Sequence, residues 1–207
     1  MTMKLFYSTG SCALASHIAL EEAGADYEAV RISLKDGDQR KPEYLKLNPK
    51  GRVPVLVTDS GVLTENVAIL AFVAQSYPAA RLAQLDDPFA FAKMQAINSY
   101  LSSTVHVAHA HKGRGSRWAD EPDAIEAMKK KVPQSVGDSF EMIERELFAG
   151  PWVIGNDYTV ADAYLYTLAS WLEGDSIDPK RFPKVFDHRN RMEQRPAVQR
   201  VLAAENA

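Results

Sequence analysis

The chain has 207 residues, a formal net charge of −3, 46% hydrophobic residues and 25% charged residues, and one cysteine. This composition is typical of a soluble globular protein with one large or two small domains. The acidic balance argues against a nucleic-acid surface, which needs a basic face, and no apolar stretch approaches the roughly 20 residues that span a bilayer. Because there is no signal-peptide pattern and a single cysteine cannot form an internal disulfide, we expect a cytoplasmic location.

The first 80 residues alternate between short apolar strands and helices. The patterns predict strands at 3–8, 27–33, 53–59 and 60–65, helices at 12–24 and 66–77, and a weak helical turn at 42–48. A helix between the first two strands favours a parallel pair, and the tight turn at Ser60-Gly61 favours an antiparallel hairpin. We therefore expect an α/β layer with the order βαβ–ββα.

The composition changes between residues 77 and 89, where prolines and aspartates interrupt the pattern. Beyond this stretch the patterns are helical, at 89–112, 121–150, 159–174 and, as two shorter helices, 182–207. Pro133 is expected to kink or break the second of these helices. The sequence thus predicts an α/β domain at 1–80, a linker at 81–87 and an all-α domain at 88–207.

The only cysteine, Cys12, stands where the first strand leads into the first helix, within "STGSCALASHIAL". Backbone N–H groups at a helix N-terminus favour a thiolate, so this position suits a reactive sulfur. The alternative is that Cys12 is simply a small buried hydrophobic residue, which is the commoner state of a lone cysteine.

Two further junctions could receive a peptide-like ligand. A cis Val53-Pro54 bond would turn the backbone of Val53 outward to pair with a ligand, although the residues alone favour a trans proline that begins an edge strand. At "TEN", a free helix N-terminus would receive a carboxylate and Glu65 an ammonium group. The alternative there is that Thr64 or Asn66 only caps the helix.

Several other residues invite a structural interpretation. His106 and His109 are three positions apart and could ligate zinc, but no third ligand has a convincing spacing, so no metal is expected. Thr159 and Asp162 form a capping box, which places them in the core and outside the active site. Three aromatic residues are either core residues or part of an apolar pocket: Trp118, Tyr166 and Trp171.

Five segments occur in a characteristic order along nearly the full chain: "MKLFYSTGSCALASHIAL", "NPKGRVPVL", "TENVAI", "YTVADAYLYTLASW" and "RPAVQRVL". With these segments the chain resembles the cytosolic glutathione S-transferases, most of all those of the bacterial beta class. The resemblance implies a thioredoxin-like domain that binds glutathione as cosubstrate, a helical domain that binds a small hydrophobic electrophile, and a homodimer.

The resemblance also implies roles for individual residues. The catalytic residues would be Cys12, beside the glutathione sulfur, and His106, which closes over the site from the helical half. Glutathione would be bound by Ser11, Lys35, Val53, Pro54, Glu65, Asn66, Ser99 and His106. Ser99 occupies a position where the beta class often has asparagine, and the hydroxyls of Ser8 and Ser11 are alternatives to Cys12 as partner of the sulfur.

The expected function is conjugation of the glutathione thiolate to small electrophiles in detoxification, with glutathione-dependent disulfide reductase or peroxidase activity through Cys12 as a side activity. One alternative keeps glutathione but changes the reaction to isomerisation, dehalogenation or ether cleavage. Another is a noncatalytic glutathione-binding or regulatory protein on the same fold. We expect no metal, nucleic-acid or membrane partner.

Overall fold

The computed structural model describes residues 2–206 and contains a four-stranded sheet. Its strands are β1 (Met3–Tyr7), β2 (Tyr27–Arg31), β3 (Val55–Thr58) and β4 (Gly61–Thr64), in the order β2-β1-β3-β4. β1 and β2 are parallel, whereas β3 is antiparallel to both β1 and β4. The predicted parallel pair and the predicted hairpin are both confirmed.

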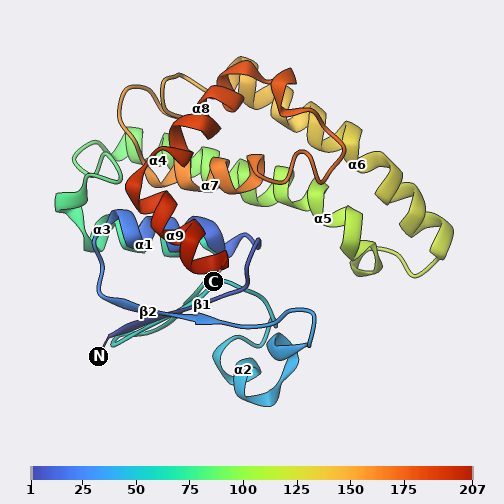
Figure 1. The fold of residues 1–207 in the computed structure, drawn as a ribbon, viewed down its shortest axis with the longest axis horizontal. Helices are drawn as coiled ribbons and strands as arrows, with labels where there is room; N and C mark the ends of the chain where they lie inside the picture. The colour runs from blue at the N-terminus through green and yellow to red at the C-terminus, as the bar shows by residue number, and fades with distance from the viewer. Residues whose placement is uncertain (1, 207) are drawn as a thin grey trace.

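Helices α1 (Ala13–Glu22) and α3 (Asn66–Ser76) cover one face of this sheet, and the short helix α2 (Pro42–Leu47) lies on the opposite side, where Tyr44 packs with Phe6 and Val55 (Figure 1). Every residue from Ala13 to Leu20 is buried, because α1 lies between the sheet and the helical half and contacts α7 and α9. Gly24, with a φ of +63°, lies just beyond α1, where the left-handed conformation that ends helices favours glycine.

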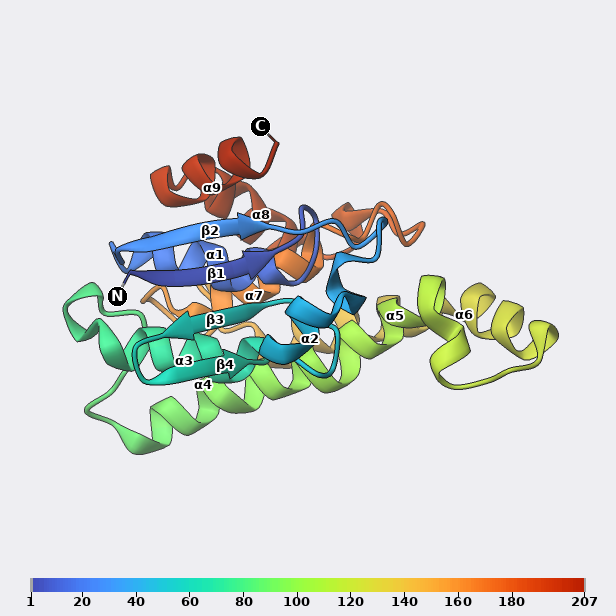
Figure 2. The ribbon, with the colours of Figure 1, turned by 90° about the horizontal axis from the view of Figure 1, so that it is seen from below.

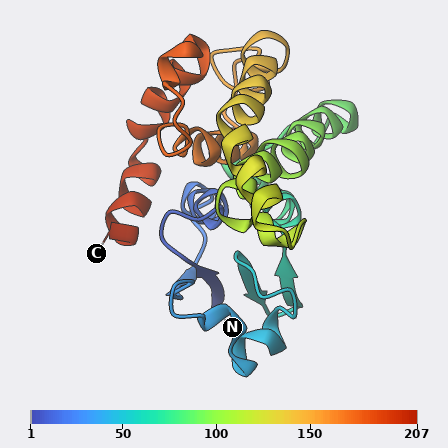
Figure 3. The same ribbon diagram turned by 90° about the vertical axis from the view of Figure 1, so that its right-hand side faces the viewer.

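The rest of the chain is helical and stacks on α1 and α3 (Figures 1 and 3). Its helices are α4 (Pro88–Tyr100), α5 (His106–Arg114), α6 (Pro122–Met142), α7 (Val160–Ala169), α8 (Pro183–Glu193) and α9 (Pro196–Asn206). Short 3₁₀ turns occur at Asp38–Arg40, Pro78–Ala80, Gly115–Arg117 and Pro179–Arg181. Within residues 2–206, no helix has the length and apolar character required to cross a membrane.

Two predicted helices differ in detail from the structure. The pattern at 89–112 is divided into α4 and α5 by a π-helical segment, Leu101–Val105. Pro133 does not break α6, which continues to Met142 and into a second π-helical segment, Ile143–Leu147. Val132, Val136 and Phe140 bury one face of α6, and this packing offsets the backbone hydrogen bond that proline removes.

The capping box predicted at Thr159 and Asp162 is present at the start of α7, all of whose residues are buried. The carboxylate of Asp162 accepts hydrogen bonds from the N–H of Thr159 at 2.7 Å and the N–H of Val153 at 2.8 Å. It also lies 2.9 Å from Nε2 of the buried His188. These contacts fix the start of α7 against Val153 and against His188 of α8, so both residues of the capping box stabilise the helical half that packs on α1.

Replacing Thr159 with alanine removes the hydroxyl from the capping box and should lower the free energy of unfolding by about 1 kcal/mol, up to about 2. Activity per folded molecule should stay nearly unchanged. Chemical denaturation and activity assays on the same preparation measure both quantities. Thr159→Ser keeps the hydroxyl and serves as control. A collapse of activity in folded Thr159→Ala would show that the residue belongs to the active site.

Candidate active site

Cys12 occupies the N-cap position of α1, immediately after the turn that follows β1. Its half-buried Sγ donates a hydrogen bond to the carbonyl oxygen of Val53 at 3.4 Å. The start of α1 and the loop before β3 therefore meet at this sulfur.

Burial raises the pKa of the Cys12 thiol to about 11, against the opposing field of Arg114. This raised pKa opposes the effect of the helix N-terminus, which favours a thiolate. The cost of taking a thiolate out of water exceeds the stabilisation that a helix dipole and a nearby guanidinium provide. At neutral pH Cys12 is a neutral S–H group, which can donate a hydrogen bond to an anionic sulfur.

The Val53-Pro54 peptide bond is cis. The preference for a trans proline that the residues alone gave is wrong, and the cis alternative considered for this bond is confirmed. The carbonyl of Arg52 accepts hydrogen bonds from Tyr44 Oη at 2.7 Å and Asn48 Nδ2 at 2.8 Å. These two contacts hold the loop against α2 and the residue after it.

The N-terminus of α3 carries no side-chain cap. Its N-cap residue is Glu65, in a left-handed backbone conformation with φ of 72°, so capping by Thr64 or Asn66 is not found. Lys50 forms an ion pair with the carboxylate of Glu65 and donates a hydrogen bond to Thr64 Oγ1 at 2.7 Å. The backbone N–H groups that begin α3 and the carboxylate of Glu65 thus lie side by side.

The side chain of Asn66 faces inward. Its Nδ2 donates to the carbonyl oxygen of Cys12 at 2.7 Å, and its Oδ1 accepts a hydrogen bond from Ser16 Oγ at 2.6 Å. Asn66 therefore ties the first turn of α3 to the first turn of α1. Both ends of its amide are occupied by these contacts, which leaves its backbone N–H as the group it can offer to a ligand.

The turn before Cys12 is held from the helical half, a feature that sequence reasoning missed. Trp171 Nε1 donates to the carbonyl of Gly10 at 3.1 Å, and the N–H of Gly10 donates to Glu205 Oε2 at 3.4 Å. The other carboxylate oxygen of the buried Glu205 lies 3.0 Å from Nδ1 of His17. These contacts fix the Gly10 peptide from two sides, and with it the direction in which Cys12 leaves the turn.

His106 packs against the same tryptophan, with ring centroids 5.3 Å apart. Burial, His109 and nearby arginines lower the pKa of His106 to about 4, so its imidazole is neutral at pH 7. His109 stacks on Trp171 at 4.3 Å and lies 2.6 Å from a carboxylate oxygen of Asp175. In the part of the chain that the structure describes, no group of three or more His, Cys, Asp or Glu residues could hold a metal ion.

Of the remaining predicted residues, the contacts place Ser11, and not Lys35 or Ser99, beside Cys12. Ser11 Oγ accepts a hydrogen bond from the N–H of Ala13 at 3.3 Å, in the first turn of α1. Lys35 is exposed in the loop after β2, and Ser99 is exposed on α4. Across residues 2–206, no hydrogen bond or ion pair joins Lys35 or the Ser99 side chain to the other predicted residues.

The three aromatic residues considered for the core or a pocket have different environments. Tyr166 is buried in the core, and Trp171 is half-buried at the site. Trp118 is 47% exposed, so the core interpretation is wrong for it; it packs edge-on against His111 with centroids 4.5 Å apart.

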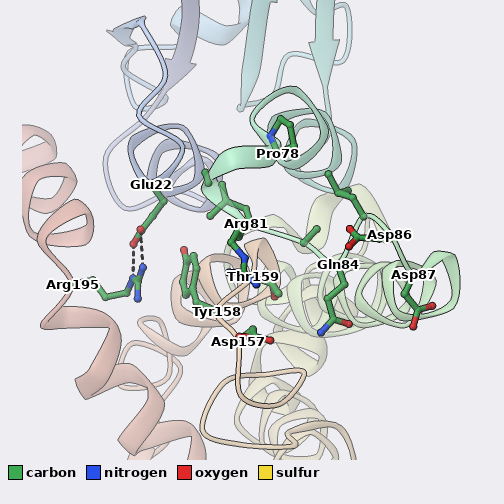
Figure 4. A pocket seen from close by; sticks show the side chains of 14 residues that line it. Glu22, Pro78, Arg81, Gln84, Asp86, Asp87, Asp157, Tyr158, Thr159 and Arg195 are labelled. Carbon is green, nitrogen blue, oxygen red and sulfur yellow. Dashed lines mark hydrogen bonds and ion pairs between the residues drawn. The ribbon is translucent and has the colours of Figure 1, made fainter.

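A cavity of about 710 Å³ lies near the C-terminal end of α1, at the opposite end of the helix from Cys12 (Figure 4). Three of its charged side chains are engaged within the protein: Glu22 pairs with Arg195, and Asp87 caps α4. None of the residues predicted to bind glutathione lines this cavity. Cys12 and the groups that contact the first turn of α1, namely Ser11, Val53 and Asn66, lie instead at the other end of the helix.

The fold and the groups around Cys12 define a thioredoxin-like unit joined to a helical unit. Residues 1–75 match the family model "Glutathione S-transferase, N-terminal domain", and residues 110–205 match "Glutathione S-transferase, C-terminal domain". Glutathione S-transferase GstA of Escherichia coli O157:H7 is 34% identical, over 98% of both chains.

Comparison with solved structures leads to the same family as the sequence matches. A glutathione transferase homologue from Sulfitobacter, with bound glutathione, has a TM-score of 0.95 at 40% identity and 98% coverage of both chains. The bacterial beta class glutathione S-transferase of Sphingomonas chungbukensis has a TM-score of 0.84 at 34% identity, again over 98% of both chains. The chain belongs to the glutathione S-transferase family, and it is a glutathione transferase that uses glutathione as cosubstrate.

The raised pKa of Cys12 predicts slow alkylation of the ligand-free protein at neutral pH. Because only the thiolate reacts, the rate with iodoacetamide should rise about tenfold per pH unit from pH 7 to 10, without a plateau. Mass spectrometry of timed samples measures this rate, and Cys12→Ala, which has no cysteine, gives the background. A rate that is already constant above pH 7 would show that Cys12 is a thiolate.

Proposed function

We propose that this glutathione transferase is a bacterial beta-class enzyme that conjugates the thiolate of glutathione to small hydrophobic electrophiles. The observation that carries the proposal is the meeting of the Cys12 thiol with the carbonyl of Val53, beside the uncapped start of α3. The similarity to the beta-class structure from Sphingomonas chungbukensis supports the class.

The sulfur of glutathione is proposed to bind beside Cys12. There the neutral Cys12 thiol turns from the Val53 carbonyl and donates its hydrogen bond to the glutathione thiolate. The backbone of Val53, before the cis Pro54, pairs with the cysteinyl part of the tripeptide as an added strand does. Ser11, at the same helix N-terminus, offers a second hydroxyl donor.

The two ends of glutathione are assigned by charge. The γ-glutamyl carboxylate meets the backbone N–H groups of Asn66 and the rest of the first turn of α3, and its ammonium group meets Glu65. In the ligand-free protein, the carboxylate of Glu65 forms an ion pair with Lys50. Binding of the glutathione ammonium group would therefore replace one cation at Glu65 with another. Lys35, exposed after β2, is proposed to approach the glycyl carboxylate.

The helical half completes the site. His106, neutral at pH 7, contacts the sulfur region without adding charge, and Ser99 takes the place of the asparagine common in the class. In this proposal residues 1–80 bind glutathione, residues 88–207 hold the electrophile, and 81–87 is the linker. The enzyme is proposed to act as a homodimer in the cytoplasm.

The size of the activation is consistent with these groups. A free thiol has a pKa of about 8.5, and lowering it by two units takes about 2.7 kcal/mol. A hydrogen bond to a charged acceptor contributes about 1.5–3 kcal/mol, and a helix N-terminus about 0.3–1 kcal/mol. The hydrogen bond from Cys12 and the N-terminus of α1 can therefore supply most of the roughly 2.7 kcal/mol that this pKa shift requires. Because a neutral Cys12 is a poor nucleophile, conjugation is favoured over disulfide reduction or peroxidase chemistry through Cys12.

Replacing Cys12 with alanine removes this donor and should raise the pKa of bound glutathione by about one to two units. Cys12→Ser keeps a donor and should retain most of the shift. The pKa is read from the pH dependence of kcat/KM with 1-chloro-2,4-dinitrobenzene, and calorimetry measures glutathione affinity.

An unchanged pKa in Cys12→Ala would show that another group, such as Ser11, activates the sulfur. If wild-type protein binds glutathione but never conjugates it, the enzyme assignment fails. If calorimetry detects no glutathione binding, the proposed site fails as well.

A further inference from the structure

Four arginines act electrostatically on Cys12, on His106 or on one another, and none of the four has a counter-ion within residues 2–206. Arg40 and Arg52 belong to the α/β half, at the end of a 3₁₀ turn and before the cis proline, and Arg114 and Arg117 lie at the end of α5 and in the turn after it. All four side chains are exposed, and within residues 2–206 none forms a hydrogen bond or ion pair. By contrast, six of the other eight arginines pair with a carboxylate: Arg145, Arg181, Arg189, Arg191, Arg195 and Arg200.

These groups lie close enough to act on one another and on the catalytic residues. Burial, Arg114, Arg52 and Arg40 together lower the pKa of Arg117. Among charged groups, Arg114 has the largest effect on Cys12. Figures 2 and 3 show the end of α5 on the same side of the molecule as α2 and the loop that leads to β3. The backbone segments that carry the arginines of the two halves thus lie on the same side of the molecule.

The turn that carries Arg114 and Arg117 is firmly packed. Gly115 is buried against α6, where a Cβ would lie 2.9 Å from Cγ2 of Ile125, so only glycine allows this close approach. On the other side of the turn, the rings of His111 and Trp118 are in edge-on contact. The two guanidinium groups therefore extend from a fixed backbone.

Uncompensated like charges at short range repel one another, and an anionic ligand relieves this repulsion. The planar guanidinium group matches a carboxylate in a two-point hydrogen bond. We propose that Arg114 and Arg117, reinforced by Arg40 and Arg52, form an anion-binding subsite for the electrophile, which selects electrophiles with a carboxylate or similar acidic group. This inference rests on the proposed glutathione site and names the substrate class of the same enzyme.

The carboxylate in question could instead be the glycyl end of glutathione. Arg114 and Arg117 belong to the helical half, which is proposed to hold the electrophile, and this favours the second substrate. The two sources differ in a measurable way. A subsite for the electrophile changes selectivity between acidic and neutral electrophiles, whereas a subsite for glutathione changes the KM for glutathione with every electrophile equally.

The test compares 4-chloro-3,5-dinitrobenzoate with its neutral carboxamide. In both reactions the glutathione sulfur bonds to the ring carbon, the carbon–chlorine bond breaks, chloride leaves with the bonding electron pair, and the thiol proton passes to solvent. Each kcat/KM is divided by the rate constant of the same electrophile with free glutathione, which removes the difference in intrinsic reactivity. The wild-type enzyme should prefer the benzoate by about tenfold or more, as expected for one charge-assisted hydrogen bond.

In the double variant Arg114→Gln/Arg117→Gln this preference, taken as the ratio of the two electrophiles with the same enzyme, should disappear, with the KM for glutathione unchanged within about twofold. Arg145→Gln removes the same type of charge from the π-helical segment after α6 and is the matched control, which should keep the preference. Equal preference in wild-type and double-variant enzyme, or a rise in the KM for glutathione with both electrophiles, overturns the proposal.

Calorimetric binding of the two finished conjugates provides a measurement without turnover. Wild-type protein should bind the acidic conjugate about tenfold more tightly than the neutral one, and the double variant should bind both equally. Equal affinities of the wild-type protein for the acidic and the neutral conjugate would overturn the proposal of an anion-binding subsite. If the affinities differ as expected but neither electrophile is consumed faster than with free glutathione, the subsite is supported and the proposed transferase chemistry is what fails.

Discussion

The site depends on one buried amide, that of Asn66, which joins the first turns of α1 and α3. Its two hydrogen bonds, to the Cys12 carbonyl and from the Ser16 hydroxyl, place two helix N-termini next to each other. Each N-terminus is suited to a negative charge. With their spacing fixed, one can meet a sulfur anion and the other a carboxylate of the same small molecule. A loss of either hydrogen bond would separate these two partial charges.

The helical half contributes more than a second binding surface. Trp171 and Glu205 hold the two sides of the Gly10 peptide, so the turn that precedes Cys12 is positioned by residues far away in the chain. His106 rests on the same Trp171 ring. Trp171 thus links the position of Cys12 to that of His106, and the two halves of the protein are coupled at the site.

Most of the fold could be predicted from the sequence, because the strands and helices have clear apolar periods and the turns have glycine or proline at the positions that require them. Cys12, Val53-Pro54 and Glu65 could be found because junctions between elements are visible in the chain. The pKa of Cys12 could not be predicted from the sequence, because it depends on how deeply tertiary packing buries the sulfur. The inward role of Asn66 and the contact of Glu205 with Gly10 join distant residues and leave no local pattern.

A crystal structure of the wild-type enzyme with reduced glutathione tests most directly whether Cys12 acts as a neutral donor to the glutathione sulfur. The account predicts a non-bonded contact between the two sulfurs at hydrogen-bonding distance, with the γ-glutamyl carboxylate at the start of α3. A covalent sulfur–sulfur bond of about 2.05 Å, or a tripeptide bound away from the N-terminus of α1, would contradict it.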